Sequence, residues 1–395
     1  MSNSATLSVD AMLDAARQET GLADFGSDEF IEPFQRLVKG IHEELPFNAM
    51  GEMVFKADVQ RLLVNRLRVE QDIKRHPEIL DEDVTDPIVI LGLVRTGTTK
   101  LQRMLSADTQ LQKLHFWKTQ NPAPFPNADP SQPDPRIAAA HQAVAMLQQI
   151  APEFMSAHPT MAEDADEDLL MMPMTFETLM LYMLNPSQQY YEWLKHRPLH
   201  HTYRYLARLL KYLQWQDGGG GGERGNRPWV LKTPVHIGNL DALLDVFPRA
   251  TLVHCHRDVT EVMPSFCRLE EAGQRLKFAN VDLQAMGPLM LAMWQTEMDK
   301  YLKLRQKRSG KLDILDVSYQ QIHRDSMQVI RAVYQLAGRH LSDEAAQAML
   351  AWERQHPKDQ FGKNEYTLEK YGLTAESVRA AFKDYLDQFG EYTTG

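Results

Sequence analysis

The stretch that decides the fold is Pro87–Thr99, which has the sequence PIVILGLVRTGTT. Its first part, Ile88–Leu91, is a continuous run of branched apolar residues that ends at a glycine. Such a run is typical of a strand buried on both faces, as in the central parallel sheet of α/β proteins. A helical pattern begins at Thr98, so a buried strand, a glycine loop and a helix are predicted in direct succession.

The loop from Gly92 to Thr99 has the glycine spacing of a phosphate-binding loop. Such loops let backbone N–H groups converge on phosphate oxygens, and the following helix N-terminus adds its positive dipole end. Thr98 stands where a nucleotide triphosphatase needs the lysine that bridges the β and γ phosphates. The loop therefore suits a single 5′-phosphate group in a diphosphate-like anhydride better than a triphosphate with Mg²⁺. The candidate binding residues are Arg95, Thr96, Gly97, Thr98 and Thr99.

Three further short apolar segments, Trp229–Leu231, Ala250–His254 and Leu312–Val317, are predicted strands. Helical patterns separate them, and strands that alternate with helices predict a parallel α/β sheet. Residues 1–85 have apolar residues at helical spacing and predict an N-terminal helical segment packed on the core. The core domain is predicted to cover residues 86–395, with C-terminal helices and a helical insert at about residues 136–215.

Composition excludes several classes of protein. The formal net charge of -10 argues against a broad nucleic-acid-binding face. Cys255 and Cys267 lie in no metal-binding spacing, which favours a reducing compartment and no metal centre. Met1–Thr20 lacks the apolar core of a secretory signal, and Leu169–Leu184 is shorter than a membrane span. We therefore expect a cytoplasmic protein with no nucleic-acid partner and no integral membrane segment.

A second anion site is predicted after the strand Ala250–His254. Arg257 follows the end of this strand, and ligands of open α/β sheets bind at the carboxyl ends of the strands. Ser265 comes eight residues later on the predicted helix. An arginine and a hydroxyl so placed could hold a phosphate through charge-assisted hydrogen bonds. The alternative is that Arg257 pairs with Asp258 or Glu261 and binds no ligand.

Taken together, these motifs resemble the sulfotransferase superfamily, in particular its bacterial branch, which is related to protein-tyrosine sulfotransferases. The similarity extends from about Leu22 to Leu373. It rests on the segments Pro87–Thr99, Arg227–Pro234, Leu240–Leu244, Phe247-Pro248 and His254–Asp258, and more weakly on Tyr366–Leu373.

The resemblance implies a P-loop-like three-layer α/β/α fold and 3′-phosphoadenosine 5′-phosphosulfate (PAPS) as donor, with PAP as product and no required metal. The residues from Arg95 to Thr99 match the 5′-phosphosulfate loop. Arg257 and Ser265 match the pair that binds the 3′-phosphate. Lys232 ends the second predicted strand, where a cation could reach the transferring group. Lys363 could approach the cofactor, although Asn364 replaces the histidine often found beside it.

The general base is the least certain part of the predicted site. Relatives commonly carry a Trp-Glu pair in this region, whereas this chain has Trp117-Lys118. An ordinary lysine is protonated at neutral pH, so His115 is the preferred base, and Lys118 could stabilise the transferring group. Other candidates are Glu163, Asp164, Glu167, Asp168, His200, His201, His236 and His256.

The acceptor is expected to be a small hydroxylated molecule. Within the insert, Leu169–Leu194 is predicted as one helix, and its methionines either pack in the core or line a site for a lipid, sterol or polyketide. The leading hypothesis is a PAPS-dependent sulfotransferase that acts by in-line transfer. The alternatives are a P-loop-type kinase or nucleotide hydrolase, and an inactive homologue that binds PAPS or PAP. The residues leave the oligomeric state and the pathway open.

Overall fold

A computed structural model describes residues 7–129, 131–218, 227–356 and 367–393. A five-stranded sheet lies at its centre, with the strand order β2-β3-β1-β4-β5 and every neighbouring pair parallel. This arrangement confirms the predicted parallel α/β sheet, and it adds β2, a two-residue strand too short to give a sequence signal. The strands are β1 Ile88–Gly92, β2 Gln112–Lys113, β3 Trp229–Lys232, β4 Thr251–His256 and β5 Ile314–Ser318.

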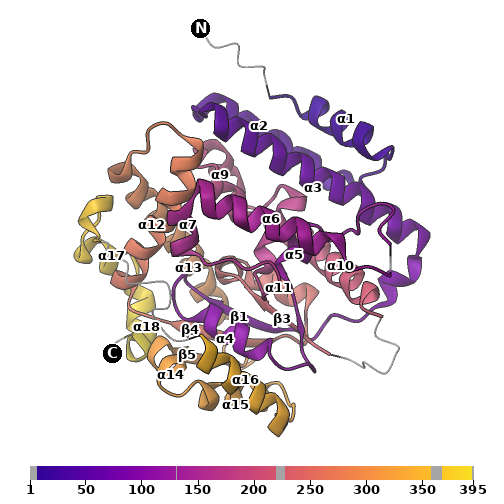
Figure 1. Ribbon diagram of the computed structural model, residues 1–395. Helices are drawn as coiled ribbons and strands as arrows, with labels where there is room; N and C mark the ends of the chain where they lie inside the picture. Colours follow the sequence, from indigo (N-terminus) through magenta and orange to yellow (C-terminus); the bar gives the residue numbers. More distant parts are fainter. Residues whose placement is uncertain (1–6, 130, 219–226, 357–366, 394–395) are drawn as a thin grey trace.

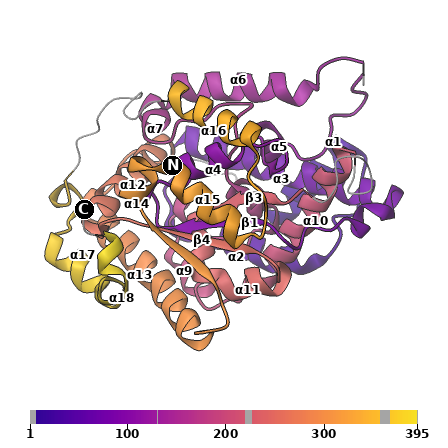
Figure 2. The same cartoon turned by 90° about the horizontal axis from the view of Figure 1, so that it is seen from below.

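Helices cover both faces of the sheet (Figure 2). Alternate residues of a strand point to opposite faces. Ile88 and Ile90 of β1 accordingly join the core formed with α4 and α15, whereas Val89 and Leu91 join the larger core on the other face. All of β1 is buried, as the apolar run predicted. The sheet with its two helical layers confirms the predicted three-layer α/β/α class.

Many helices pack around this sheet (Figure 1). The 3₁₀ segments are η1 Asp28–Phe30, η2 Pro77–Asp81, η3 Asp168–Leu170, η4 Met172–Thr175, η5 Pro234–Asn239 and η6 Glu369–Tyr371. The α-helices are α1 Val9–Thr20, α2 Ile31–Glu44, α3 Ala49–Arg75, α4 Thr98–Leu105, α5 Phe116–Gln120, α6 Pro135–Ile150, α7 Pro152–Ala157, α8 Leu179–Leu184, α9 Gln188–Leu194, α10 His200–Gln216, α11 Leu240–Val246, α12 Val259–Lys277, α13 Leu283–Lys307, α14 Tyr319–Arg324, α15 Ser326–Leu336, α16 Asp343–Gln355, α17 Ala375–Ala381 and α18 Lys383–Thr393.

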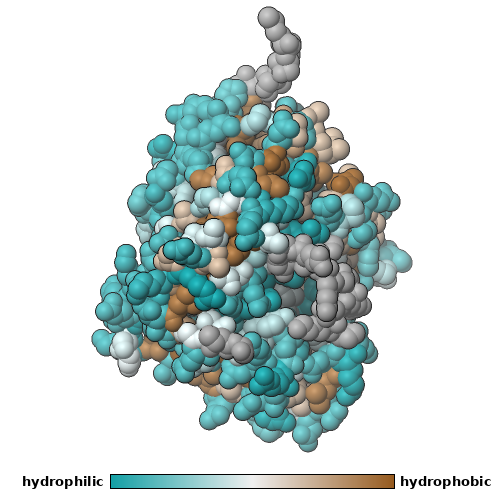
Figure 3. Space-filling model, turned by 90° about the vertical axis from the view of Figure 1, so that its left-hand side faces the viewer, coloured by the Kyte–Doolittle hydropathy of each residue, from teal (hydrophilic) through white to brown (hydrophobic). Residues whose placement is uncertain are grey.

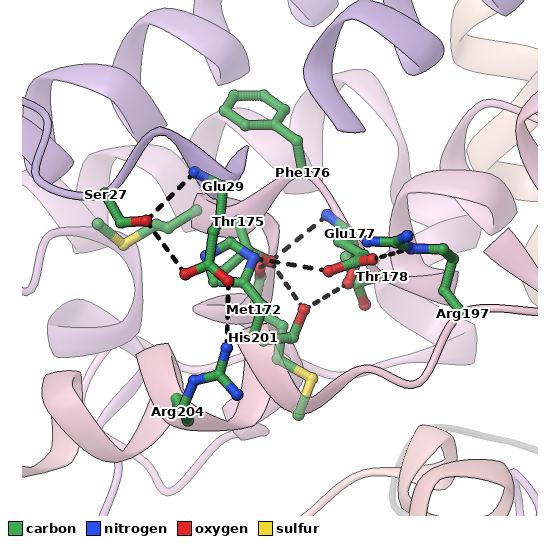
Figure 4. A network of polar contacts seen from close by, with 12 residues as sticks. Ser27, Glu29, Met172, Thr175, Phe176, Glu177, Thr178, Arg197, His201 and Arg204 are labelled. Carbon is green, nitrogen blue, oxygen red and sulfur yellow. Dashed lines mark hydrogen bonds and ion pairs between the residues drawn. The ribbon is translucent and has the colours of Figure 1, made fainter. Parts of the chain in front are cut away.

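The prediction of one helix over Leu169–Leu194 is wrong, because this stretch forms η3, η4, α8 and α9. Phe176 ends η4 with a φ of 53°, a left-handed conformation that costs an L-residue about 1–2 kcal/mol. Its ring stacks on Phe34, with the centroids 4.1 Å apart. Glu177, the next residue, lies between Arg197 and His201 (Figure 4), and its Oε1 accepts a 2.8 Å hydrogen bond from Arg197. Packing and this buried carboxylate therefore break the helix where the sequence pattern alone continues it.

The N-terminal helices share one apolar core with the sheet. Phe34 of α2 and Leu63 of α3 belong to the same cluster as Leu91 and Leu231 of the strands. The surface in Figure 3 is mostly hydrophilic, and its hydrophobic side chains lie in separate patches. Among the described helices, none combines the length and the apolar composition that a membrane crossing requires.

Candidate active site

The loop between β1 and α4 depends on its two glycines. Gly92 lies against β4, and a Cβ added there would stand 2.6 Å from the carbonyl oxygen of Cys255. Gly97 has a φ of 89°, which favours glycine, and it precedes the first residue of α4. Arg95, which is not a glycine, also has a left-handed backbone, with a φ of 65°. The backbone thus turns sharply between strand and helix, as phosphate-binding loops do.

The loop threonines have different surroundings. Thr96 is buried, and its hydroxyl donates a 2.7 Å hydrogen bond to the carbonyl of Leu93, which holds the loop in shape. Thr98 is also buried, whereas Thr99 is half-buried. Gly97 offers no side-chain cap to α4. The positive end of this helix is therefore available to an anion in the loop.

Lys232 brings a cation to the loop from the neighbouring strand. It is the last residue of β3, and its ammonium donates a 3.2 Å hydrogen bond to Thr99 Oγ1. The same ammonium binds the carboxylate of Glu167. The Lys232 side chain is 2% exposed and the Glu167 side chain 13% exposed. The structure therefore joins the loop, a buried lysine and a carboxylate from three separate segments.

The acidic segment reaches this place through backbone contacts. Gln102 of α4 donates a 2.8 Å hydrogen bond to the carbonyl of Asp166, and Arg103 donates one of 3.1 Å to the carbonyl of Pro159. A bridge between His115 and Ala165 pairs the segment with the chain that enters α5. These contacts draw Glu167 inward, where its carboxylate binds Lys232.

Arg257 also lies at the loop. Its guanidinium donates a 2.9 Å hydrogen bond to the carbonyl of Arg95 and lies over the ring of Tyr319, 4.1 Å from the centroid. It pairs with Glu261 at 2.6 Å as well. Arg257 therefore forms the predicted ion pair with Glu261 and also lies beside the glycine loop. A cavity of about 180 Å³ adjoins Arg257 and Tyr319. Ser265 is buried two turns further along α12.

His115 and Lys118 lie in a different group of charges from Lys232. The His115 Nδ1 lies 2.6 Å from the carbonyl of Glu163, and burial lowers the pKa of the imidazole. Lys118 is buried, and its ammonium binds both carboxylate oxygens of Asp217 at 2.6 and 2.7 Å. Burial also lowers the pKa of Lys118. The charges of Lys113, Lys118 and Asp217 act on the His115 imidazole.

The other sequence candidates are dispersed. His200 pairs with Asp245 at 2.8 Å, and His201 lies 3.5 Å from Glu177. Glu163 contacts His141 on the surface, and Asp164 lies 3.9 Å from Arg103. Lys363 lies outside the described residues, as does Asn364 beside it.

His158 is a candidate that sequence reasoning missed. The charged groups around its ring are Asp166, Glu167, Lys232 and Arg103, and burial lowers the pKa of this imidazole. It follows the short helix α7 and precedes the acidic segment, in a stretch with no motif. Only the approach of this segment to β3 places an imidazole among these charges.

Within the described ranges of the chain, one group of side chains has ligand atoms close enough for a metal ion: His254, His256 and Asp316. Most of their polar atoms are engaged with protein groups, although His254 Nε2 has no hydrogen-bond partner among the described residues. Arg305 donates hydrogen bonds of 2.8 and 2.9 Å to the two Asp316 oxygens, and Tyr385 lies 2.9 Å from His256 Nδ1. Burial lowers the pKa of His254 to about 3, so the ring is neutral. The geometry fits a buried hydrogen-bond network that ties α18 to β4 and β5.

This geometry defines a class: a parallel α/β/α protein with a glycine loop after its first strand, and with Lys232 and Arg257 at or just past the ends of the two neighbouring strands. The chain belongs to the sulfotransferase family, whose family model, described as "Sulfotransferase family", matches residues 87–343. This match confirms the family resemblance of the sequence motifs.

Three relatives support the assignment. The crystal structure of sulfotransferase STF9 from Mycobacterium avium is 30% identical, with a TM-score of 0.86 over 98% of both chains. Sulfotransferase STF1 from Mycobacterium tuberculosis H37Rv is 27% identical, with a TM-score of 0.82 over 96% of this chain and 99% of that one. The omega-hydroxy-beta-dihydromenaquinone-9 sulfotransferase Stf3 of Mycobacterium bovis is 24% identical over 77% of this chain and 75% of its own.

Proposed function

We propose that this protein transfers a sulfuryl group from PAPS to the hydroxyl of a hydrophobic small molecule, with Glu167 as the general base. The observation that carries the proposal is the contact of Lys232 with both Thr99 Oγ1 and Glu167 at the end of β3. A cation beside an anion-binding loop stabilises charge on a leaving phosphate, and the adjacent carboxylate can accept a proton.

The residues at the loop fit the two phosphate groups of PAPS. The turn at Gly92 and Gly97, together with the α4 N-terminus, would hold the 5′-phosphosulfate. Arg257 touches the loop carbonyl of Arg95 and would bind the 3′-phosphate together with Ser265. Arg95 and Lys232 would neutralise charge near the transferring group. Charge neutralisation here comes from side chains and backbone, so the scheme needs no metal ion.

In the proposed reaction the acceptor oxygen bonds to sulfur while the bond from sulfur to the bridging phosphate oxygen breaks. Glu167 takes the acceptor's proton, and PAP leaves with the electron pair of the broken bond. We prefer Glu167 to His115 because Glu167 touches Lys232, whereas His115 lies among Lys113, Lys118 and Asp217. Lys118 is held by Asp217, so we assign it a structural role.

A hydrophobic acceptor is supported by one relative and by α6. The relative named above is a sulfotransferase for a menaquinone derivative. In this chain α6 has two large exposed apolar side chains, Met146 at 55% and Ile150 at 39%. His141 of α6 contacts Glu163 of the acidic segment, 3.0 Å away, so the helix lies near the site. The methionines of η4 and α8 belong to the core instead. The free, buried Cys255 and Cys267 fit a reducing compartment, and we propose the cytoplasm as the place of the reaction.

The test is transfer of radiolabelled sulfate from PAPS, without added metal, to a panel of phenols, sterols and long-chain alcohols. We expect transfer to the apolar members and binding of PAP in calorimetry. PAP binding without any transfer or slow hydrolysis would favour an inactive homologue. Mg²⁺-dependent turnover of ATP would instead support a kinase or nucleotide hydrolase. We do not expect this result, because Thr98 stands where such enzymes need a lysine.

The nucleotide site has its own prediction. Replacing Arg257 with alanine should weaken PAP binding by about 10- to 100-fold, because hydrogen bonds to charged groups contribute about 1.5–3 kcal/mol. Calorimetric titration measures the change. Arg379→Ala is the matched control, since Arg379 is an exposed arginine that pairs with the neighbouring Asp258 at 3.2 Å. Equal affinities for the two variants would overturn the assignment of Arg257.

A further inference from the structure

Behind Lys232 lies a chain of buried polar groups. Asp168 has no exposed surface, and its Oδ1 accepts a 2.9 Å hydrogen bond from the main-chain N–H of Lys232. Its Oδ2 lies 3.2 Å from Nε2 of His236, and neither atom has a hydrogen-bond partner among the described residues. The Nδ1 of His236 is 2.9 Å from the hydroxyl of Tyr203. All three side chains are at most 1% exposed.

The direction of this chain follows from its chemistry. Burial raises the pKa of Tyr203 well above its ordinary value, so the phenol carries its proton, and its oxygen lies 2.9 Å from Nδ1 of His236. The Asp168 carboxylate that faces Nε2 can only accept a hydrogen bond. We therefore infer that the ring proton lies on Nε2 and that Nδ1 accepts from the Tyr203 hydroxyl. Each group therefore orients the next, from Tyr203 on α10 to the backbone of β3.

Two adjacent carboxylates hold the two ends of Lys232. Glu167 binds the ammonium, and Asp168 binds the main-chain N–H. The orientation of Asp168 therefore influences where Glu167, the residue before it, lies relative to the end of β3. A buried carboxylate is costly unless its oxygens have partners, and His236 supplies the partner for Oδ2. Loss of that partner would let Asp168 turn and carry Glu167 with it.

We propose that Tyr203 and His236 are positioning residues that act through Asp168 to hold the Lys232–Glu167 pair against the loop. The proposal rests on the function proposed above, since it concerns the same pair. Neither side chain needs to touch donor or acceptor. Misplacement by about 1 Å can cost about 100-fold in rate, so a hydroxyl distant from the chemistry can control turnover.

The experiment compares Tyr203→Phe with Tyr212→Phe. Both tyrosines are buried on α10, but the Tyr212 hydroxyl donates to Asp72, away from Lys232. Sulfate transfer from PAPS to 2-naphthol, PAP affinity and thermal unfolding are measured for each variant. We expect Tyr203→Phe to lower kcat by about 10- to 100-fold with PAP affinity within about twofold of wild type. Tyr212→Phe should leave kcat within about twofold.

A double-variant cycle separates positioning from a general loss of structure. In a Lys232→Met background, Tyr203→Phe should change the remaining rate by less than about twofold, because residues that act through one another are not additive. Equal kcat values for the two tyrosine variants would overturn the proposal. So would an undiminished effect of Tyr203→Phe in the Lys232→Met background.

Histidine NMR gives a readout that needs no acceptor. With ¹⁵N-labelled histidine and His236→Asn for assignment, His236 should be protonated at Nε2 in wild type and lose this fixed tautomer in Tyr203→Phe. An Nδ1-protonated ring in wild type would overturn the proposed chain. If wild type binds no PAP and transfers no sulfate, the proposed function fails. The NMR result still decides whether the positioning chain exists.

Discussion

Two buried lysines of this protein face carboxylates, and they have different surroundings. Lys232 pairs with Glu167 at the end of β3 and also reaches Thr99 of the loop. Lys118 pairs with Asp217 between α5 and the end of α10, where the Arg136 guanidinium lies over the neighbouring Trp117 ring. We therefore place the proposed reaction centre at the Lys232 pair, which lies beside the loop, and not at the Lys118 pair.

The exposure of the carboxylates differs as well. The Glu167 side chain is 13% exposed and that of Asp217 is 38% exposed. Water can solvate Asp217 if its lysine is removed, whereas Lys118, at 7% exposure, has little access to water. Removal of Lys118 should therefore destabilise the protein less than removal of the Asp217 charge. Measurements of stability can test this difference.

The largest expected effect is on Glu167. Glu167→Gln keeps the shape of the side chain and removes the proton acceptor, so sulfate transfer should fall by about 100- to 10,000-fold. PAP affinity should stay within a few fold. Initial rates with radiolabelled PAPS and calorimetry with PAP measure the two quantities.

Glu163→Gln is the matched control for this variant, since Glu163 belongs to the same acidic segment and its side chain is 61% exposed. Its transfer rate should equal that of wild type. A Glu167→Gln enzyme with wild-type turnover would remove Glu167 from the mechanism and leave His158, which lies among Asp166, Glu167 and Lys232, as the next candidate base.

An intermediate effect is expected on stability at Asp217. Asp217→Asn leaves the buried Lys118 ammonium without its counter-charge, and breaking a buried pair in this way costs about 3–5 kcal/mol. Lys118→Met should cost about 1 kcal/mol or less, because the remaining carboxylate is partly solvated. Urea unfolding measures both changes in the free energy of unfolding.

Because we assign this pair a structural role, transfer rates of the two variants, measured on folded protein, should change by less than about threefold. Such a change corresponds to less than about 1 kcal/mol in the activation barrier. A 100-fold loss of turnover in Lys118→Met would show that Lys118 contacts the transferring group, contrary to the structural role assigned here.

The smallest expected effect is at His115. His115→Asn keeps a donor near Nδ1, so kcat should change by less than about threefold. Burial lowers the pKa of His115 below its ordinary value of 6.5, so the ring is neutral above that pH and the rate profile there should not change. If His115 were the base, its acid limb below pH 6.5 would disappear with the side chain.

The same shift has a consequence for stability. The unfolded imidazole takes up a proton near pH 6.5, whereas the folded ring takes it up only at a lower pH. Wild type should therefore lose stability as the pH falls below 6.5, and His115→Asn should lose less over that range. Unfolding curves at a series of pH values measure the difference.

Parts of the site could be predicted because their signals are local. The buried run Ile88–Leu91, the glycines at 92 and 97 and the absent lysine at Thr98 lie within one short stretch of chain. Lys232 and Arg257 each follow a predicted strand, and parallel strands bring their carboxyl ends to one edge of a sheet. The expectation that both residues lie at the loop follows from that rule, and the contacts to Thr99 and to Arg95 agree with it.

The acidic segment and the histidines could not be ranked in this way. Glu163, Glu167 and Asp168 look alike in the sequence, yet one is exposed, one binds Lys232 and one is fully buried. The segment's position depends on hydrogen bonds from Gln102 to the carbonyl of Asp166 and from Arg103 to the carbonyl of Pro159, just before the segment, which no side-chain pattern encodes.

The amino-acid sequence by itself determined the class of protein. The parallel α/β fold and the glycine loop without the kinase lysine follow from residue periodicity and spacing over a few residues. The sulfotransferase family follows from the resemblance of several longer motifs to that family. Only the tertiary structure decided which carboxylate faces Lys232 and which histidine lies against Asp168. The physical reason is that the Glu167-Asp168 pair, Tyr203 and the segment with Lys232 and His236 are far apart in the sequence, so their contacts form only when the chain folds.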